Sequence, residues 1–256
     1  MTGRGENSYV CRGQAEAPHD LRPSLARLLA GELDRSKALE AENRAMGMFK
    51  AEAHLHLPPS WLPHMPPEPA LAEWWALMQH HSAPTRLLDW TSSLYAAAYF
   101  AVSSAWDRDG SVFLFHGNAF LAGTKERYGE RTTFRNEDFL RPTASDRLTV
   151  WTPTRKTDRM VAQQGAFTVG LDVLADHGRA IDDILAPRQE VARDMILYLR
   201  LVIPSKLKPE FMLHLRQMNI AAHSLFPGPD GLGRSVADLV RVARAMQLLG
   251  ATPSDL

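Results

Sequence analysis

The chain has 256 residues, which is enough for one large domain or two small ones. Hydrophobic residues make up 45% of it and charged residues 23%, and these fractions exclude an intrinsically disordered chain. The 29 Lys and Arg residues balance the 29 Asp and Glu residues, so no field of the whole protein attracts nucleic acid or an anionic membrane. Any binding of that kind must depend on a local patch.

The cysteine content and the apolar runs narrow the class of protein further. The single cysteine, Cys11, excludes an intramolecular disulfide and a zinc site built from several thiolates. Residues Met1 to Ser8 lack the apolar core of a signal peptide, and the longest apolar run, Leu94–Val102, is too short to span a bilayer. We therefore expect a cytoplasmic protein with no membrane contact.

The first half of the chain predicts a strand, helices and an ordered loop. A short β-prone run covers Ser8–Arg12, and helical spacing of apolar residues over Leu33–Leu55 predicts one long helix or two short ones. Six prolines in Leu57–Pro69 predict a loop, since prolines at that density sustain neither a helix nor a central strand. A helix over Ala70–His81 and a short strand or turn over Thr85–Trp90 follow.

Strand and helix signals continue to the end of the chain. Small and aromatic residues over Ser93–Ala105 predict a buried helix that is capped by Ser92 or Ser93. The remaining expected elements are strands at Ser111–Phe115, Ala166–Leu171 and Met195–Ile203, and helices at Lys206–Met218 and Gly233–Leu249 around a turn at Ser224–Gly231. Because strands are spread through the whole chain, we expect a single α+β domain.

Three segments have an unusual composition for plain scaffold: Tyr9–Gln14, Gln79–Ser93 and Gln163–Phe167. With Pro23-Ser24-Leu25, the run Pro84-Thr85-Arg86-Leu87-Leu88-Asp89-Trp90-Thr91 and the late Leu225-Phe226-Pro227-x-x-Asp230-Gly231, they resemble the FRG domain, named for an aromatic-Arg-Gly motif. One departure is that two residues separate Tyr9 from Arg12. The resemblance covers residues 8–236, is strongest over 8–105 and 160–236, and implies one FRG-type domain over residues 1–256.

The same three segments, in the same order, are similar to the motifs of the ADP-ribosyltransferases. That superfamily has a first-strand Arg or His followed by Gly, a second strand with Ser-Thr-Ser or an equivalent, and a later strand with the catalytic Glu. The resemblance implies an α+β fold with a split mixed or antiparallel sheet core and surrounding helices. It also implies NAD as substrate, and a toxin or phage-defence effector that modifies RNA, DNA or protein under the control of an antitoxin or regulatory partner.

The chemistry of that reaction assigns roles to individual residues. Cleavage of the nicotinamide–ribose bond passes through an oxocarbenium-like centre, so the site must clamp nicotinamide, hold the pyrophosphate and stabilise positive charge. The resemblance places Arg12 and Gln164 in catalysis, and Asp89 is a candidate for the acid. It places NAD binding on Arg12 with its planar donor fork, on the backbone of a glycine without a Cβ, and on neighbouring hydroxyls and amides, namely Gly13, Gln14, Thr91, Ser92 and Gln163.

The catalytic acid of the third motif is missing. Gln163 and Gln164 stand where the superfamily has a Glu, and glutamine forms hydrogen bonds but does not act as a base. Two readings stay open. Either Asp89 or Asp230 supplies the acid, or the protein is a non-enzymatic FRG module that senses a nucleotide or binds a partner.

Structural alternatives stand beside these roles. Arg12 could pair with a carboxylate near a sheet edge, and Arg86 with Asp89 could pin the turn. Trp90 is more typical of a core residue than of a stacking platform, and Thr91 or Ser92 could serve as a helix cap.

Other chemistries find little support in the sequence. We expect no metal site, because His54 and His56 point apart on a helix and no carboxylate stands at ligand spacing near His80-His81. Cys11 beside Arg12 as a nucleophile is the weaker reading, since buried strands often include one cysteine. A Ser/His hydrolase would need a Gly-x-Ser-x-Gly elbow, which the sequence lacks.

Overall fold

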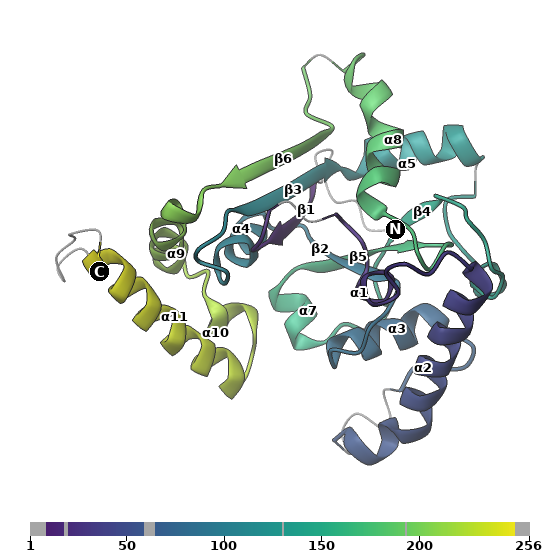
Figure 1. The fold of residues 1–256 in the computed structure, drawn as a ribbon, viewed down its shortest axis with the longest axis horizontal. Helices are drawn as coiled ribbons and strands as arrows, with labels where there is room; N and C mark the ends of the chain where they lie inside the picture. The colour runs from purple at the N-terminus through teal and green to yellow at the C-terminus, as the bar shows by residue number, and fades with distance from the viewer. Residues whose placement is uncertain (1–8, 18–19, 59–64, 130, 193, 249–256) are drawn as a thin grey trace.

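The fold is α+β, with one six-stranded sheet and helices on both of its faces (Figure 1). The computed structural model describes residues 9–17, 20–58, 65–129, 131–192 and 194–248. The strand order is β4-β5-β2-β1-β3-β6 and every neighbouring pair is antiparallel, so the sheet is antiparallel and not mixed. The strands are β1 Tyr9–Gln14, β2 Leu87–Thr91, β3 Gly110–His116, β4 Leu148–Trp151, β5 Gly165–Gly170 and β6 Tyr198–Ile203.

The second helix of the chain is long and continuous. Asp34 caps the long second helix by accepting from the backbone N–H groups of Ser36 and Lys37, and this helix runs unbroken for 22 residues, so the one-helix alternative holds. The helices are α1 Ser24–Leu28, α2 Arg35–His56, α3 Leu71–His80, α4 Leu94–Val102, α5 Gly117–Tyr128, α6 Asn136–Phe139, α7 Asp158–Ala162, α8 His177–Gln189, the 3-10 turn η2 Ser205–Leu207, α9 Lys208–Gln217, α10 Ala222–Leu225 and α11 Pro229–Leu248.

The sheet is nearly divided between its two central strands. β1 and β2 are in register only at Cys11 and Thr91, whereas β1 pairs with β3, and β2 with β5, along their whole lengths. The sheet therefore consists of a β4-β5-β2 half and a β1-β3-β6 half that diverge beyond Cys11. An opening of this kind leaves backbone groups and side chains of both central strands available for other contacts.

Alternation along the strands builds cores on both faces of the sheet. Cys11 and Val112 pack with α4, α9, α10 and α11, while Phe113 and Phe115 face the opposite way toward α5 and α8. The β2-β5 half packs against α2 and α3 through a third cluster that includes Trp75. The strand registers place the α9–α11 cluster and the α2–α3 cluster on the same face of the sheet, at its β1-β3-β6 and β4-β5-β2 ends, whereas α5 and α8 lie on the opposite face (Figure 1).

Several predicted boundaries need correction. The buried helix ends at Val102 instead of Ala105, because Ala105 adopts a left-handed conformation with φ 47°. The turn predicted over Ser224–Gly231 is shorter in the structure, where only residues 226–228 separate the end of α10 at Leu225 from the start of α11 at Pro229. A proline fits the start of a helix, where its missing N–H has no intrahelical acceptor.

Some predicted segments lie outside the described residues, and some helices and strands were not predicted. The strand predicted from Met195 starts only at Tyr198, and β4, α1, α5, α6, α7, α8 and α10 were not predicted. Ser8, at the start of the first predicted strand, and residues 59–64 of the proline-rich loop lie outside the described residues. The described parts of that loop contain no helix or strand.

No described helix combines the length and the apolar composition that crossing a membrane requires.

Candidate functional site

Arg12 lies where the two halves of the sheet diverge. Its Nη1 donates to the backbone carbonyl of Asp89 at 2.7 Å, so a side chain of β1 replaces the missing ladder contact to β2. The same Nη1 lies 3.9 Å from the Asp89 carboxylate, and the side chains of Arg12 and Asp89 are 16% and 62% exposed. Asp89 is therefore the solvent-exposed member of the pair, and Arg12 is the less exposed member, held by the hydrogen bond to the Asp89 carbonyl.

The electrostatics of Arg12 favour an anionic partner. Burial lowers the pKa of its guanidinium, the Asp89 carboxylate opposes that shift, and the positive charge of Arg27 adds to it. The Arg12 Nε is also buried and has no hydrogen-bond partner among the described residues. An incompletely paired cation beside a second cation is stabilised by an anion that approaches both.

A pocket of about 170 Å³ opens beside this pair. Arg12 and Arg27 supply its positive charges, Asp89 its carboxylate, and the whole lining is Arg12, Ser24, Arg27, Gln79, Ser82, Ala83, Leu87, Leu88 and Asp89. The pocket thus joins β1, α1, β2 and the end of α3, which are separate in sequence. Its lining does not include Thr91, Gln163 or Gln164.

Two pocket residues come from motif positions to which the sequence analysis gave no site role. The Ser24 hydroxyl accepts from the Thr85 backbone N–H at 3.1 Å, and the Thr85 hydroxyl donates to Gln79 Oε1. Pro23-Ser24-Leu25, Gln79 and Thr85 are therefore tied together at the rim of the Arg12 pocket. The signal in the sequence was only that these polar side chains belong to two of the FRG-like motifs, and polar residues have no periodicity that identifies a site.

The second and third motifs meet each other on β2 and β5. The Thr91 hydroxyl donates to the Gln163 carbonyl at 2.7 Å and accepts from the Ser93 N–H at 2.9 Å. The exposed Ser92 hydroxyl donates to Gln164 Oε1 at 3.1 Å. The cap of α4 is Ser93, which accepts from the Ala96 N–H, and not Ser92. Thr91 is therefore occupied on both sides by protein, whereas Ser92 and Gln164 stay accessible.

The structure brings the three predicted strands together, although only part of the set shares the pocket. β1, β2 and β5 are neighbours in the sheet, as the motif positions predicted. The side-chain amide of Gln163 donates to the Leu225 carbonyl at 3.0 Å, which ties the β5 motif to the late Leu-Phe-Pro motif. Gln164 has a left-handed backbone, with φ 49°, at the tight entrance to β5.

Packing explains Gly13, whereas Gln14 keeps a buried oxygen that is unpaired among the described residues. A Cβ at Gly13 would lie 1.9 Å from the Ala97 carbonyl oxygen, so the glycine lets the backbone of α4 approach β1. Gln14 pairs in register with Ser111, and its Oε1 is buried without a partner among the described residues. The absence of a side chain at Gly13 is thus explained by packing.

Arg86 does not pair with Asp89, so that structural alternative is wrong. Its guanidinium is buried and donates to both carboxylate oxygens of Glu42, at 2.8 and 3.0 Å from Nε, and to the Leu171 carbonyl at 2.9 Å. It also stacks on Trp75, with 4.6 Å from Cζ to the ring centroid. Arg86 lies just before β2 and its side chain points to Glu42 of α2, so it is not the partner of Asp89.

Trp90 is a core residue, as its type predicted. Its Nε1 donates to the Thr168 hydroxyl at 2.8 Å, and that hydroxyl lies 2.8 Å from His177 Nδ1. The Thr168 hydroxyl that accepts from Trp90 keeps one proton and one further lone pair, so either tautomer of His177 can form this second hydrogen bond. Burial lowers the pKa of His177 to about 3, and the nearby charges of Arg12 and Arg86 act in the same direction.

The remaining candidate residues lie away from this chemistry. Asp230 is an exposed residue in the first turn of α11. Cys11 is buried, and burial raises the pKa of its thiol to about 11, which disfavours the thiolate that a nucleophile requires. Within the described residues no group of three or more His, Cys, Asp and Glu side chains could hold a metal ion.

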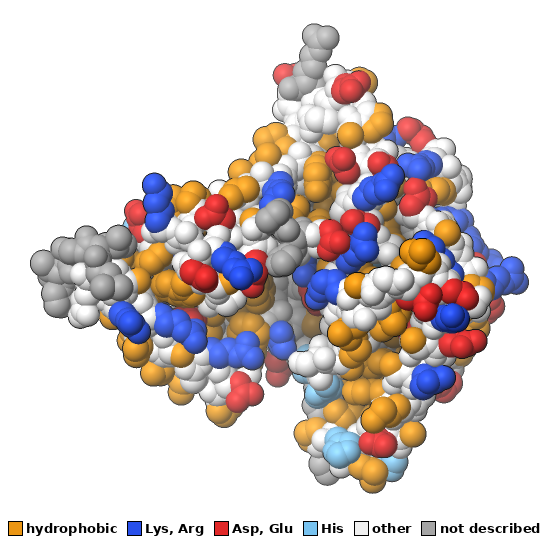
Figure 2. Space-filling view, viewed as in Figure 1, with side chains coloured by type: hydrophobic (Ala, Val, Ile, Leu, Met, Phe, Trp, Pro, Cys, Tyr) orange, Lys and Arg blue, Asp and Glu red, His pale blue; other side chains and the backbone are white. Residues whose placement is uncertain are grey.

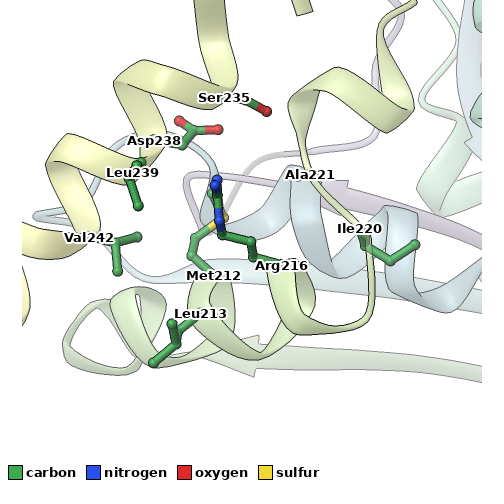
Figure 3. A pocket seen from close by; sticks show the side chains of 9 residues that line it. All are labelled: Met212, Leu213, Arg216, Ile220, Ala221, Ser235, Asp238, Leu239 and Val242. Carbon is green, nitrogen blue, oxygen red and sulfur yellow. The ribbon is translucent and has the colours of Figure 1, made fainter. Parts of the chain in front are cut away.

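Other cavities differ from the Arg12 pocket in size and lining. A cavity of about 20 Å³ between α9 and α11, drawn in Figure 3, has room for little more than a water molecule. A larger one, about 880 Å³, lies between α3 and the segment before α7, where Glu73 and Lys156 contribute charges of both signs. Neither contains Arg12 or Asp89, so cavity size alone does not identify the motif site.

The class of protein that these observations define is an α+β protein with a nearly divided antiparallel sheet, whose motif residues meet at the division. Residues 7–110 match the family model of the FRG domain. The matched part contains Arg12, the Arg12 pocket, Asp89 and α4, while β5 and the late Leu-Phe-Pro motif lie beyond it. No curated protein and no solved structure matches the chain.

Proposed function

We propose that the protein is an NAD-dependent ADP-ribosyltransferase. The observation that carries the proposal is the position of Arg12 and Asp89, side by side at the opening of the divided sheet, with Arg27 across a pocket of about 170 Å³. A planar guanidinium with a buried, unsatisfied Nε and a second arginine suit phosphate oxygens. An exposed carboxylate in the same place suits ribose hydroxyls and developing positive charge.

The divided sheet supports this function through fold resemblance. A split sheet core is what similarity to the ADP-ribosyltransferases implies, and here the β4-β5-β2 and β1-β3-β6 halves share one register pair. The first motif lies on one half, and the second and third motifs lie on the other. A shared fold does not by itself imply a shared function, so the Arg12–Asp89 arrangement is the stronger support for ADP-ribosyl transfer.

The proposed reaction balances without a further reactant. The bond between the nicotinamide nitrogen and ribose C1 breaks, and nicotinamide leaves with the bonding electron pair as a neutral molecule. An acceptor nucleophile, or water in its absence, forms the new bond to C1 and releases a proton. Asp89 offsets the positive charge that develops at the ribose, Arg12 and Arg27 hold phosphate, and the exposed Ser92 and Gln164 offer hydrogen bonds to hydroxyl groups.

A direct assay tests the proposal. The purified chain is incubated with NAD, and nicotinamide release is followed by chromatography and mass spectrometry. We expect release by wild-type protein and none by Asp89→Asn. Release that is equal in the two proteins would remove Asp89 from the reaction, and no release by wild-type protein with any of protein, RNA or DNA as acceptor would refute the enzymatic function.

A second function, that of a nucleotide-sensing module without catalysis, is favoured by the third motif. Gln163 and Gln164 replace the expected Glu, and the Gln163 side chain serves to hold the Leu225 carbonyl. Such a module would bind NAD with the same dependence on Arg12 but release no nicotinamide. Calorimetric titration with NAD, performed beside the release assay, therefore separates the two functions.

A further inference from the structure

Two arginines enclose the phenylalanine of the late Leu-Phe-Pro motif. Arg159 of α7 lies with its Cζ 4.7 Å from the Phe226 ring centroid, and Arg234 of α11 lies with its Cζ 4.6 Å from it. The ring is fixed in turn, because the Gln163 amide holds the preceding Leu225 carbonyl. Two positive groups from separate helices are thus held close together against one aromatic ring.

The charges of this pair are not neutralised locally. Among the described residues, neither Arg159 nor Arg234 has a carboxylate within ion-pair distance. Burial lowers the pKa of Arg159, Asp89 opposes that shift and Arg234 adds to it. Arg159 is therefore within electrostatic reach of both the proposed catalytic carboxylate and Arg234, and links the candidate site to α11.

The positive surface continues along α11. Arg234, Arg241 and Arg244 are exposed and stand seven and three residues apart, spacings that put side chains on one side of a helix. The ten residue steps from Arg234 to Arg244 cover about 15 Å. Figure 2 shows Lys and Arg side chains in a row along the edge of the lobe where Figure 1 places α11, and the row leads to a notch between the lobes.

The acidic residues of α11 neutralise this row only in part. Asp238 is buried and accepts from the Tyr99 hydroxyl at 2.8 Å, and it pairs with Arg241 at 3.3 Å. Asp230 is exposed at the opposite end of the helix from Arg244. Because the chain as a whole has no net charge, a row of arginines with few acidic neighbours is a local surplus.

We propose that this arginine row, Arg159, Arg234, Arg241 and Arg244, binds the phosphodiester backbone of a single-stranded nucleic acid, which is the acceptor of the proposed transfer. That the nucleic acid is the acceptor rests on the proposed function, whereas the binding of nucleic acid to the arginine row does not. A row of arginines whose Arg159 end is within electrostatic reach of Asp89 fits a single strand, because a base must be out of a duplex stack before its atoms reach a pocket. Arginine also offers bases a planar stacking surface.

Fluorescence anisotropy with a labelled 12-nucleotide RNA and the equivalent DNA, without NAD, tests the inference. We expect binding that weakens as salt rises, with each phosphate contact contributing about 0.7 to the slope of log affinity against log salt. The variant R234Q/R244Q should lower that slope by about 1.4 and weaken binding at every salt concentration. R179Q removes the same kind of charge from the exposed face of α8 and should leave binding unchanged.

Three results would overturn the inference. They are absence of binding by the wild-type protein, equal loss in R179Q and R234Q/R244Q, and tighter binding of a polyglutamate of equal charge or of a duplex than of the single strand. Melting curves of both variants confirm that they are folded. Nicotinamide release in the absence of nucleic acid reports on the proposed function alone, so failure of one proposal is distinguishable from failure of the other.

Discussion

Two arginines of the FRG-like motifs have opposite environments. Arg86 is buried, with its guanidinium bonded to both oxygens of Glu42, to the Leu171 carbonyl and to the Trp75 ring. Arg12 is held by one backbone carbonyl and faces an exposed Asp89 carboxylate. A cation whose partners are all protein groups stabilises the fold, whereas a cation with an unsatisfied donor at a pocket is available for a ligand.

A structural arginine and a ligand-binding arginine in such motifs differ in their partners and not in their sequence context. Both residues lie in segments of equally distinctive composition, and neither sequence spacing nor residue type separates them. The number of hydrogen-bond and ion-pair partners, and the burial of those partners, distinguish Arg86 from Arg12. The following predictions test that separation, from the largest expected change in stability to the smallest.

The largest loss of stability should follow the breaking of the buried pair. Glu42→Gln leaves the Arg86 charge buried without its counter-charge, and such a loss typically costs about 3–5 kcal/mol of unfolding free energy. Urea unfolding followed by tryptophan fluorescence measures it. Arg131→Gln is the control, because it removes an exposed pair with Asp138 and should cost less than about 1 kcal/mol. Equal effects in the two variants would contradict the structural role of Arg86.

Acid should destabilise the protein through His177. Its pKa is lowered to about 3 in the folded chain and stays near 6.5 in the unfolded chain, so the unfolded chain takes up a proton first. The stability contributed by the neutral ring is complete above pH 6.5 and is lost as the pH falls toward 3, by up to about 1.4 kcal/mol per pH unit. Unfolding free energies at pH 7.5, 6.5 and 5.5 check the slope.

A variant isolates the contribution of His177 from those of other titrating groups. His177→Gln has no titrating side chain, so its stability should decline less steeply between pH 6.5 and 5.5 than that of the wild-type protein. Parallel curves would show that the buried Trp90–Thr168–His177 chain is not the source of the acid sensitivity.

Local sequence signals gave most of the elements but not their long-range partners. The helical spacing of apolar residues was enough to place α2, and β-prone residues were enough to place β1 and β3. In contrast, β4 has only four residues, and α8 has Pro187 inside it, so neither shows a clear pattern in the sequence. Their presence depends on packing against β5 and α5.

The candidate site was predictable as a set of segments and not as a set of contacts. Composition alone marked the three segments that the sheet order brings together. Nothing in the sequence indicated that Arg86 turns toward Glu42, 44 residues earlier, or that Gly13 is needed for the approach of α4. Arg27 and the Phe226 arginines are likewise defined by contacts between distant elements.

Arg12→Lys should have a small effect on stability and a clear effect on NAD binding. Lysine keeps the positive charge but loses the planar fork and the buried Nε, so binding should weaken by about 1–3 kcal/mol. Calorimetric titration of NAD measures the change, and Arg179→Lys on exposed α8 is the matched control. Unchanged affinity in Arg12→Lys would exclude Arg12 from the NAD site.

Asp89→Asn should have the smallest effect on stability and the largest effect on turnover. The Asp89 side chain is 62% exposed and its carboxylate lies 3.9 Å from Arg12, while the Arg12 hydrogen bond goes to the Asp89 backbone carbonyl, which the substitution keeps. An exposed pair of this kind contributes less than about 1 kcal/mol. The amide fills the same space without the negative charge, so nicotinamide release should be abolished while NAD still binds.

Asp230→Asn, on exposed α11, is the matched control for the loss of one carboxylate and should release nicotinamide at the wild-type rate. An Asp89→Asn protein that melts several degrees early but turns over normally would show that Asp89, like Glu42, stabilises the fold, and the contrast between the two arginines would then be one of degree.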